Sequence, residues 1–132
     1  MAEKPALILV VDDELDILRL VETVLRQAGY LVTTARSADA AIRAVATMAL
    51  KPALLLTDVV MPGMSGPVLA DQLMADIASL RVVFMSGYDD RQIVKRYVLE
   101  KGFSLITKPF KPPALLAAVQ AALAAPPRPV GG

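Results

Sequence analysis

The sequence predicts an α/β fold in which five parallel strands alternate with five helices that cover both faces of the sheet. Four short runs are almost continuously apolar, which is typical of strands that are buried on both faces of a parallel sheet. Between these runs the spacing of apolar residues changes from two to about 3.6, the period of a helix. Because the two patterns alternate strictly, they indicate right-handed crossovers and a doubly wound sheet.

The predicted strands differ in how apolar they are. The four continuous runs lie at residues 6–11, 53–57, 82–85 and 105–107. A fifth run, at residues 31–35 after Gly29 and Tyr30, is more polar. This composition predicts a strand at the edge of the sheet, where one side is open to water.

Five apolar stripes with helical spacing predict the helices. Gly29 is a good stop for the first helix, and Ser37 is a plausible cap for the second. The third follows Gly66 and Pro67, and the last follows Pro112 and Pro113. In order along the chain, the stripes consist of Ile17, Val21, Val24, Leu25 and Ala28; Ala38, Ala41, Ile42, Val45 and Ala49; Val68, Leu69, Leu73 and Ile77; Ile93, Val94, Tyr97 and Val98; and Leu115, Leu116, Val119 and Leu123.

Length and composition narrow the possible functions. The 132 residues suffice for one domain, which we place at residues 5–125, followed by a tail rich in proline and glycine at residues 126–132. The chain contains no cysteine and no histidine, which excludes disulfides, zinc sites with sulfur ligands and histidine-based catalytic triads. Any acid or base must therefore be a carboxylate, a lysine or a tyrosine.

The net charge and the residues at the start of the sequence predict the location of the domain and the kinds of partner it contacts. The net charge of +1 provides no global field toward nucleic acid or an anionic membrane, and no DNA-recognition motif is present. The residues before Asp12 contain neither a signal peptide nor a membrane anchor. We therefore expect a cytoplasmic domain that has no direct contact with nucleic acid or membrane and recognises its partners through local surfaces.

Three aspartates follow two of the predicted strands directly. Asp12 and Asp13 come after the first run, and Asp58 comes after the third. Strands that are adjacent in a sheet lie about 4.8 Å apart, so the three carboxylates would converge at one edge. Either some of them stay protonated or a cation joins them, and oxygen ligands without sulfur or imidazole favour Mg²⁺ or a similar hard ion.

Two further strand ends supply groups that suit phosphoryl chemistry. The fourth run leads into Ser86, a hydroxyl donor, and Gly87, which lets the backbone come close. The fifth leads into Lys108, a mobile positive charge, and Pro109, whose peptide bond can be cis. Taken singly, such residues are more often caps, turn residues or solvated charges. Their joint placement at successive strand ends predicts a site for phosphoryl transfer to a carboxylate.

Over residues 6–123 the chain resembles the response-regulator receiver family of two-component signalling. Four separated motifs carry the resemblance, in the family's order and spacing: Val10-Val11-Asp12-Asp13-Glu14; Thr57-Asp58-Val59-Val60-Met61-Pro62-Gly63-Met64-Ser65-Gly66; Met85-Ser86-Gly87-Tyr88; and Lys108-Pro109-Phe110. The resemblance implies a flavodoxin-like (βα)5 fold with strand order 2-1-3-4-5. It also implies a phosphoacceptor domain of a phosphorelay, which switches conformation to signal and is not an enzyme in its own right.

The resemblance also implies a role for each site residue. Asp58 would accept a phosphoryl group from a histidine kinase or a histidine phosphotransfer protein. Mg²⁺ would be held by Asp13, Asp58 and the backbone carbonyl of Val60, with support from Asp12 through water. Ser86 and Lys108 would bind the phosphoryl oxygens. The face made by the fourth helix, fifth strand and fifth helix would carry the output, with a homodimer as one form of it.

The sequence departs from the family pattern near this output face. The family has an aromatic residue three positions before the lysine, and here that position is Leu105. Tyr88 and Phe103 are nearby candidates for its role. Val60 and Tyr88 flank the path expected for an attacking water, and their bulk is expected to slow self-hydrolysis of the phosphorylated form.

The motifs around Asp58 and Ser86 look most like receivers joined to hybrid sensor histidine kinases. Three other kinds of protein fit these motifs less well. A haloacid dehalogenase would place its nucleophile after the first strand, with a second aspartate two residues on, where this chain has Glu14. A flavodoxin-like cofactor binder would need a phosphate loop after the first strand, but that segment is acidic. A degenerate receiver would lack a pocket residue, and all are present.

Overall fold

The computed structural model describes residues 5–87, 92 and 94–126. Strands and helices alternate along this part of the chain, as the sequence predicts. Their bounds are β1 (Leu7–Val11), α1 (Leu15–Gln27), β2 (Leu31–Ala35), α2 (Ala38–Thr47), β3 (Leu54–Asp58), α3 (Gly66–Asp76), β4 (Arg81–Ser86), η2 (Val94–Leu99), β5 (Ser104–Thr107) and α5 (Pro112–Ala124).

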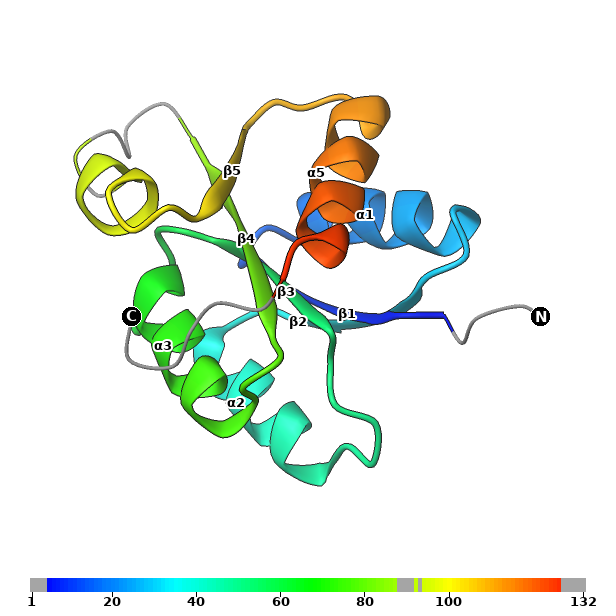
Figure 1. Ribbon diagram of the computed structural model, residues 1–132, viewed down its shortest axis with the longest axis horizontal. Coiled ribbons are helices and arrows are strands. Elements are labelled where there is room, and N and C mark those ends of the chain that lie inside the picture. The colour runs from blue at the N-terminus through cyan, green and yellow to red at the C-terminus, as the bar shows by residue number, and fades with distance from the viewer. Residues whose placement is uncertain (1–4, 88–91, 93, 127–132) are drawn as a thin grey trace.

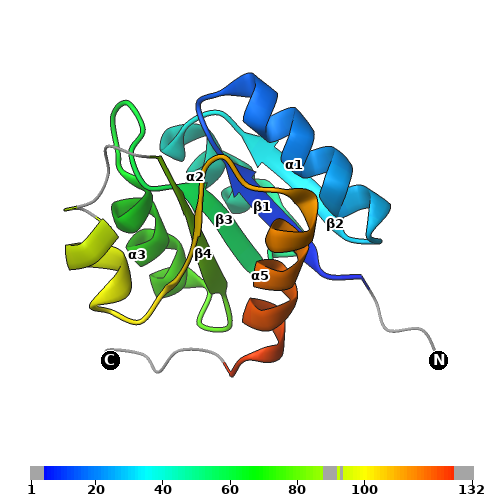
Figure 2. The same ribbon diagram turned by 90° about the horizontal axis from the view of Figure 1, so that it is seen from above.

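The five strands form one parallel sheet between two layers of helices. Their order is β2-β1-β3-β4-β5, which confirms the expected strand order and the edge position of residues 31–35. Helices α1 and α5 cover one face of the sheet, and α2 and α3 cover the other (Figures 1 and 2). The predicted doubly wound fold is therefore confirmed.

Alternation along the strands divides the interior into two separate cores. In β1, Leu9 and Val11 face the core shared with α2, α3 and η2, whereas Ile8 and Val10 face the core shared with α1 and α5. The same alternation holds in β3 and β4. Because side chains in a strand point to opposite faces in turn, continuous apolar runs are needed to fill both cores.

Side chains cap two of the helices. The hydroxyl of Ser37 accepts a hydrogen bond from the backbone N–H of Ala40 at 3.1 Å, which confirms the predicted cap of α2. Ser65 caps α3 in the same way, through the N–H of Val68 at 3.4 Å. Both bonds satisfy N–H groups that the first turn of a helix leaves without a partner.

Where the structure describes the fourth predicted helix, residues Val94–Leu99 form η2, which has the wider π-helical turn. Val94 and Val98 of η2 are buried in the core shared with α2 and α3, as their spacing predicts. Ile93 and Tyr88, which the sequence also singled out, lie outside the described residues. Leu105 is half-buried against the same core, and Phe103 makes an edge-on ring contact with Phe84, with 5.3 Å between the ring centroids.

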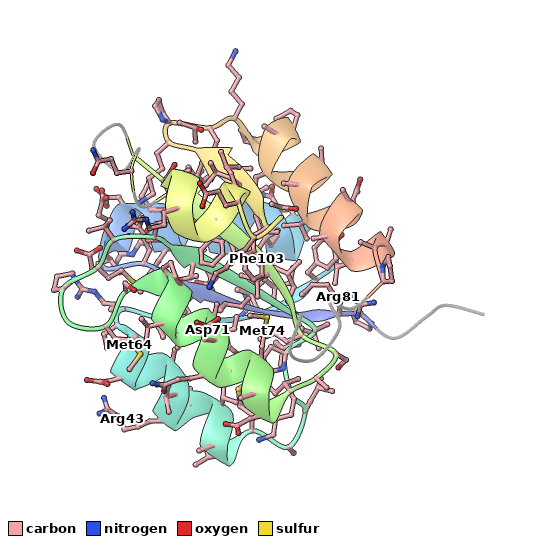
Figure 3. All side chains as sticks on the ribbon, turned by 60° about the vertical axis from the view of Figure 1, so that its left-hand side comes forward. Arg43, Met64, Asp71, Met74, Arg81 and Phe103 are labelled. Atoms are coloured by element: carbon pink, nitrogen blue, oxygen red, sulfur yellow. The ribbon has the colours of Figure 1, made fainter. Side chains whose placement is uncertain are left out.

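Two arginines tie the amino-terminal end of the sheet to neighbouring helices. Arg81, at the start of β4, donates two hydrogen bonds to the carbonyl of Ala125 at the end of α5, at 3.3 and 3.1 Å. Figure 3 shows Arg81 beside that end of the helix. Arg26 of α1 pairs with Glu22 and donates to the carbonyl of Val32 in β2. Both contacts lie far along the strands from the predicted site.

Candidate functional site

The register of the sheet brings the predicted site residues to one edge. Val11 lies opposite Thr57, so Asp12 and Asp58 follow next to each other at the ends of β1 and β3. Ser86 lies opposite Thr107, so Lys108 follows beside the end of β4. The carboxyl ends of four parallel strands therefore meet at one place, where sheets of this type form their sites.

The ammonium of Lys108 lies among three carboxylates. Its Nζ is 2.7 Å from Oδ2 of Asp12, 3.2 Å from Oδ2 of Asp58 and 3.4 Å from Oε1 of Glu14. Asp12 also accepts a hydrogen bond from the backbone N–H of Glu14 through its other oxygen, at 2.9 Å. The predicted convergence of Asp12, Asp58 and Lys108 is thus observed in the structure.

Burial makes this cluster electrostatically unusual. The side chain of Asp12 is fully buried, and that of Asp58 is 8% exposed. Burial raises the pKa of Asp12, although the hydrogen bond from Lys108 acts in the opposite direction. Burial alone would lower the pKa of Lys108, but the hydrogen bond to Asp12 and the charge of Asp58 outweigh it, so its pKa lies above the ordinary value. Lys108 therefore stays an ammonium.

The backbone around Asp58 is held on several sides. Its carbonyl accepts a hydrogen bond from the hydroxyl of Thr57 at 3.1 Å, and the N–H of Val59 donates to Met85 in β4 at 2.9 Å. The N–H of Gly66 donates to the carbonyl of Val59, also at 2.9 Å. A Cβ atom at Gly66 would overlap the carbonyl oxygen of Asp58. The start of α3 thus packs on the Asp58 backbone as closely as only glycine allows.

The other predicted site residues lie nearby, with different surroundings. Ser86 is buried, and its carbonyl accepts a hydrogen bond from the N–H of Lys108 at 2.7 Å. The peptide bond between Lys108 and Pro109 is cis, as the sequence allows. Asp13 is half-buried, and its carbonyl accepts a long hydrogen bond from Arg36 at 3.4 Å. Val60, two residues after Asp58, is exposed.

The carboxylates offer a set of hard oxygen ligands. Among the described residues, Asp12, Glu14 and Asp58 each present an oxygen atom within 4.8 Å of the others. Carboxylate oxygens are the kind of ligand that Mg²⁺ prefers, so the chemistry of this group suits that ion. Asp13, which the sequence predicts as a ligand, is not part of this group, so its role stays a prediction.

Sequence reasoning missed two residues that shape the site. The sequence predicts no role in the site for Glu14, yet its carboxylate reaches Lys108. The sequence places Gly66 in the Asp58 motif and at a helix start without predicting that it permits the close packing on Asp58. The acidic run from Asp12 to Asp16 carried a signal for Glu14, but the spacing alone did not show which acids turn toward the lysine.

Within the described part of the chain, we find no helix both long and apolar enough to cross a lipid bilayer.

The comparisons with known proteins point to one family. The family model described as "Response regulator receiver domain" matches residues 8–120. The nitrogen assimilation regulatory protein NtrX of Azorhizobium caulinodans is 33% identical over 118 residues, which are 88% of this chain and 26% of that protein. The DNA-binding response regulator MtrA of Mycobacterium tuberculosis is 34% identical, covering 88% of this chain and 50% of that protein.

Solved structures agree with this relationship. The receiver domain of NtrX from Brucella abortus has a TM-score of 0.78 at 34% identity, covering 88% of this chain and 97% of that one. A receiver domain protein from Clostridium thermocellum has a TM-score of 0.80 at 26% identity, covering 89% and 94%. The chain spans about half or less of the length of the curated relatives described above. It belongs to the response regulator receiver family and is a receiver domain of the two-component signalling type.

Proposed function

We propose that Asp58 is the residue that accepts the phosphoryl group. The observation that carries the proposal is the position of its buried carboxylate beside Lys108, at the meeting point of the strand ends. An oxygen of Asp58 would attack the phosphorus atom, and the bond from phosphorus to the donor atom would break. The products are an aspartyl phosphate and the free donor, a histidine imidazole in a kinase or phosphotransfer protein.

The neighbouring residues would neutralise the charge of the transferred group. Lys108 is held 3.2 Å from Asp58 and stays protonated, so it can pair with a phosphoryl oxygen. Ser86 at the end of β4 would donate its hydroxyl to another oxygen. Positioning and charge neutralisation are the main requirements of phosphoryl transfer, so this set needs no separate base.

The proposed metal is Mg²⁺, which when bound supplies further positive charge against the phosphoryl oxygens. Asp12 and Asp58 fit as ligands because their oxygens lie within one small group. The resemblance adds Asp13 and the carbonyl of Val60 as ligands, and Glu14 lies in the same group of oxygens, where it contacts Lys108. If Mg²⁺ binds here, it raises the temperature of unfolding of the native chain but not of Asp58→Asn.

The first test is the mass of the intact protein after incubation with Mg²⁺ and acetyl phosphate. We expect the native chain to gain one phosphate, and Asp58→Asn to gain none. The matched control is Asp76→Asn, which removes an exposed aspartate at the end of α3 and should be phosphorylated normally. A native chain that folds and binds Mg²⁺ but stays unmodified would contradict the proposal and favour a module that only binds partners.

Val60 would lengthen the life of the phosphorylated form. The residue is 44% exposed and lies two positions after Asp58, where its side chain can shield the phosphate from water. An asparagine at this position would be smaller and able to orient water. We therefore expect Val60→Asn to shorten the half-life of the aspartyl phosphate. An unchanged half-life would rule this role out.

The output would run through the face made by η2, β5 and α5. Leu105 takes the place of the family's aromatic, and it is half-buried in the core beside Phe103. Phe103 is a candidate for the moving residue because it already contacts Phe84 across the strands. Homodimer formation on this face is one form of output, and light scattering with and without acetyl phosphate would test it. A mass that stays monomeric in both states would exclude the dimer.

The larger setting of the domain, residues 5–125, is also a proposal. The motifs around Asp58 and Ser86 suggest a receiver of a hybrid histidine kinase, whereas the relatives reported above are named as regulators. A kinase core in the same reading frame would support the hybrid setting, and a DNA-binding output domain there would contradict it. We propose a cytoplasmic location without direct contact to DNA or membrane, which a fluorescent fusion and a gel-shift assay would test.

A further inference from the structure

The resting partners of Lys108 use all of its hydrogen-bonding capacity. An ammonium has three N–H donors and no acceptor. Three carboxylate oxygens surround this one, at 2.7 Å from Asp12, 3.2 Å from Asp58 and 3.4 Å from Glu14. A phosphoryl oxygen that pairs with Lys108 must therefore replace one of these partners.

The three carboxylates differ in how easily they give up the contact. Asp12 is fully buried and Asp58 is 8% exposed, so either would be left as a poorly solvated charge without the lysine. The side chain of Glu14 is 62% exposed, and its contact is the longest. Its carboxylate can return to water at little cost, because exposed ion pairs are weak.

We infer that Glu14 is a positioning residue, which holds the third N–H of Lys108 at rest and yields it to the phosphoryl oxygen. The inference rests on the proposed role of Asp58 as the phosphoryl acceptor. Glu14 thus occupies, in the resting state, the place of an anion that arrives later. Its effect is a mild brake on phosphorylation, because each transfer first separates Glu14 from Lys108.

The position of Glu14 allows a clean test by substitution. It stands at the N-terminal cap of α1, but its side chain makes no capping hydrogen bond, so neither variant removes a cap. Glu14→Asp keeps the charge but shortens the side chain by one methylene, which draws the carboxylate away from Lys108. Glu14→Gln keeps the length but loses the charge. Asp16→Asn is the control, because it removes an exposed charge from the first turn of α1.

The contact between Glu14 and Lys108 in the unphosphorylated protein is measured through the reactivity of the Lys108 amine toward an acetylating reagent. The exposed Lys111 serves as the internal reference. Peptide mass spectrometry gives the ratio of the two. We expect Glu14→Asp and Glu14→Gln to raise the relative labelling of Lys108 about two- to five-fold, the range for loss of one exposed ion pair. Asp16→Asn should label like the native chain.

The separation of Glu14 from Lys108 is tested on the same proteins by the rate of phosphorylation by acetyl phosphate at saturating Mg²⁺. Both Glu14 variants should be phosphorylated about two- to five-fold faster than the native chain, and Asp16→Asn at the native rate. Circular dichroism checks that all variants are folded.

The outcomes separate this inference from the proposed function. If Lys108 labelling and phosphorylation stay at native values in Glu14→Asp, the inference is wrong and the role of Asp58 stands. If Asp16→Asn accelerates both as much as the Glu14 variants do, the effect is one of general charge, and the inference is again wrong. If neither the native chain nor any variant is phosphorylated, the proposed function is wrong. The inference that Glu14 gives up Lys108 to a phosphoryl group is then wrong too, even if the labelling of Lys108 rises in the variants.

Discussion

The two ends of the sheet use cationic side chains in opposite ways. At the carboxyl end, Lys108 pairs with Asp12 and Asp58, whose side chains are almost wholly buried. At the amino end, Arg81 binds a helix-terminal carbonyl near the surface, and Arg26 pairs with Glu22 in water. The same kind of contact should therefore matter greatly at one end and little at the other, because removal of one partner costs most where the remaining charge cannot be solvated.

The largest effect is expected for Lys108→Met, which keeps the length of the side chain and removes its charge. Asp12 and Asp58 would then repel each other in a buried place, so we expect the free energy of unfolding to fall by about 3 kcal/mol at neutral pH. Urea denaturation measures this loss, and added Mg²⁺ should recover part of it. Lys111→Met, at an exposed position three residues on, is the control. Equal losses in the two variants would contradict the contrast.

A somewhat smaller effect is expected for Gly66→Ala. The added methyl group would meet the carbonyl oxygen of Asp58, so the start of α3 must move and we expect a loss of about 1–3 kcal/mol. Because the Asp58 backbone moves too, phosphorylation should also slow. Gly29→Ala is the control, since Gly29 has a φ of 98° but open space around it. Its strain should lower stability by about 1 kcal/mol and leave phosphorylation unchanged.

At the amino end, Arg81→Ala should lower the free energy of unfolding by only about 0.5–1 kcal/mol, because the freed carbonyl of Ala125 can bond to water. Hydrogen exchange should rise in the last turn of α5 and stay native at the site. Arg43→Ala on the exposed surface of α2 provides the comparison and should be close to neutral. A loss as large as that of Lys108→Met would show that burial does not set the difference.

The smallest expected effect is that of pH on the stabilisation by Lys108, which should not change between neutral and mildly alkaline pH. The folded-state pKa of Lys108 lies above its ordinary value of 10.5, so its contribution to stability is fully present below that value and is lost only as the pH rises further. The difference in unfolding free energy between the native chain and Lys108→Met should thus stay constant between about pH 7 and pH 9.5. A decline within this window would mean that the ammonium loses its proton earlier than the buried ion pairs imply.

The sequence was informative wherever one pattern determined one structural feature. Continuous apolar runs predicted the strands because each strand fills two cores, and Ser37 predicted its helix start because its hydroxyl serves a nearby N–H. Asp12, Asp58 and Lys108 could be placed together because parallel strands end at a common edge. These predictions needed only local periodicity and the rules of the sheet.

Other features depend on distances that no pattern records. The contact of Glu14 with Lys108 joins residues 94 positions apart, and it depends on which way an exposed side chain turns. The need for glycine at position 66 arises from a backbone approach across the loop between β3 and α3. The π-helical turn of η2 was expected as an ordinary helix, because its apolar spacing alone does not distinguish the two over so few residues.

The division of the interior into two cores has one more consequence. The buried residues of the two cores form separate sets, and the sheet stands between them as a partition. By the alternation of their strands, Asp12, Asp58 and Lys108 are on the side of the sheet that faces α1 and α5. Ser86 is on the other side, because it lies two residues after Phe84, which faces α3 and η2. The carboxyl edge of the sheet is thus where residues in the phase of both cores meet. The proposed phosphorylation of Asp58 at this edge would therefore act on the helices of both faces, through different side chains.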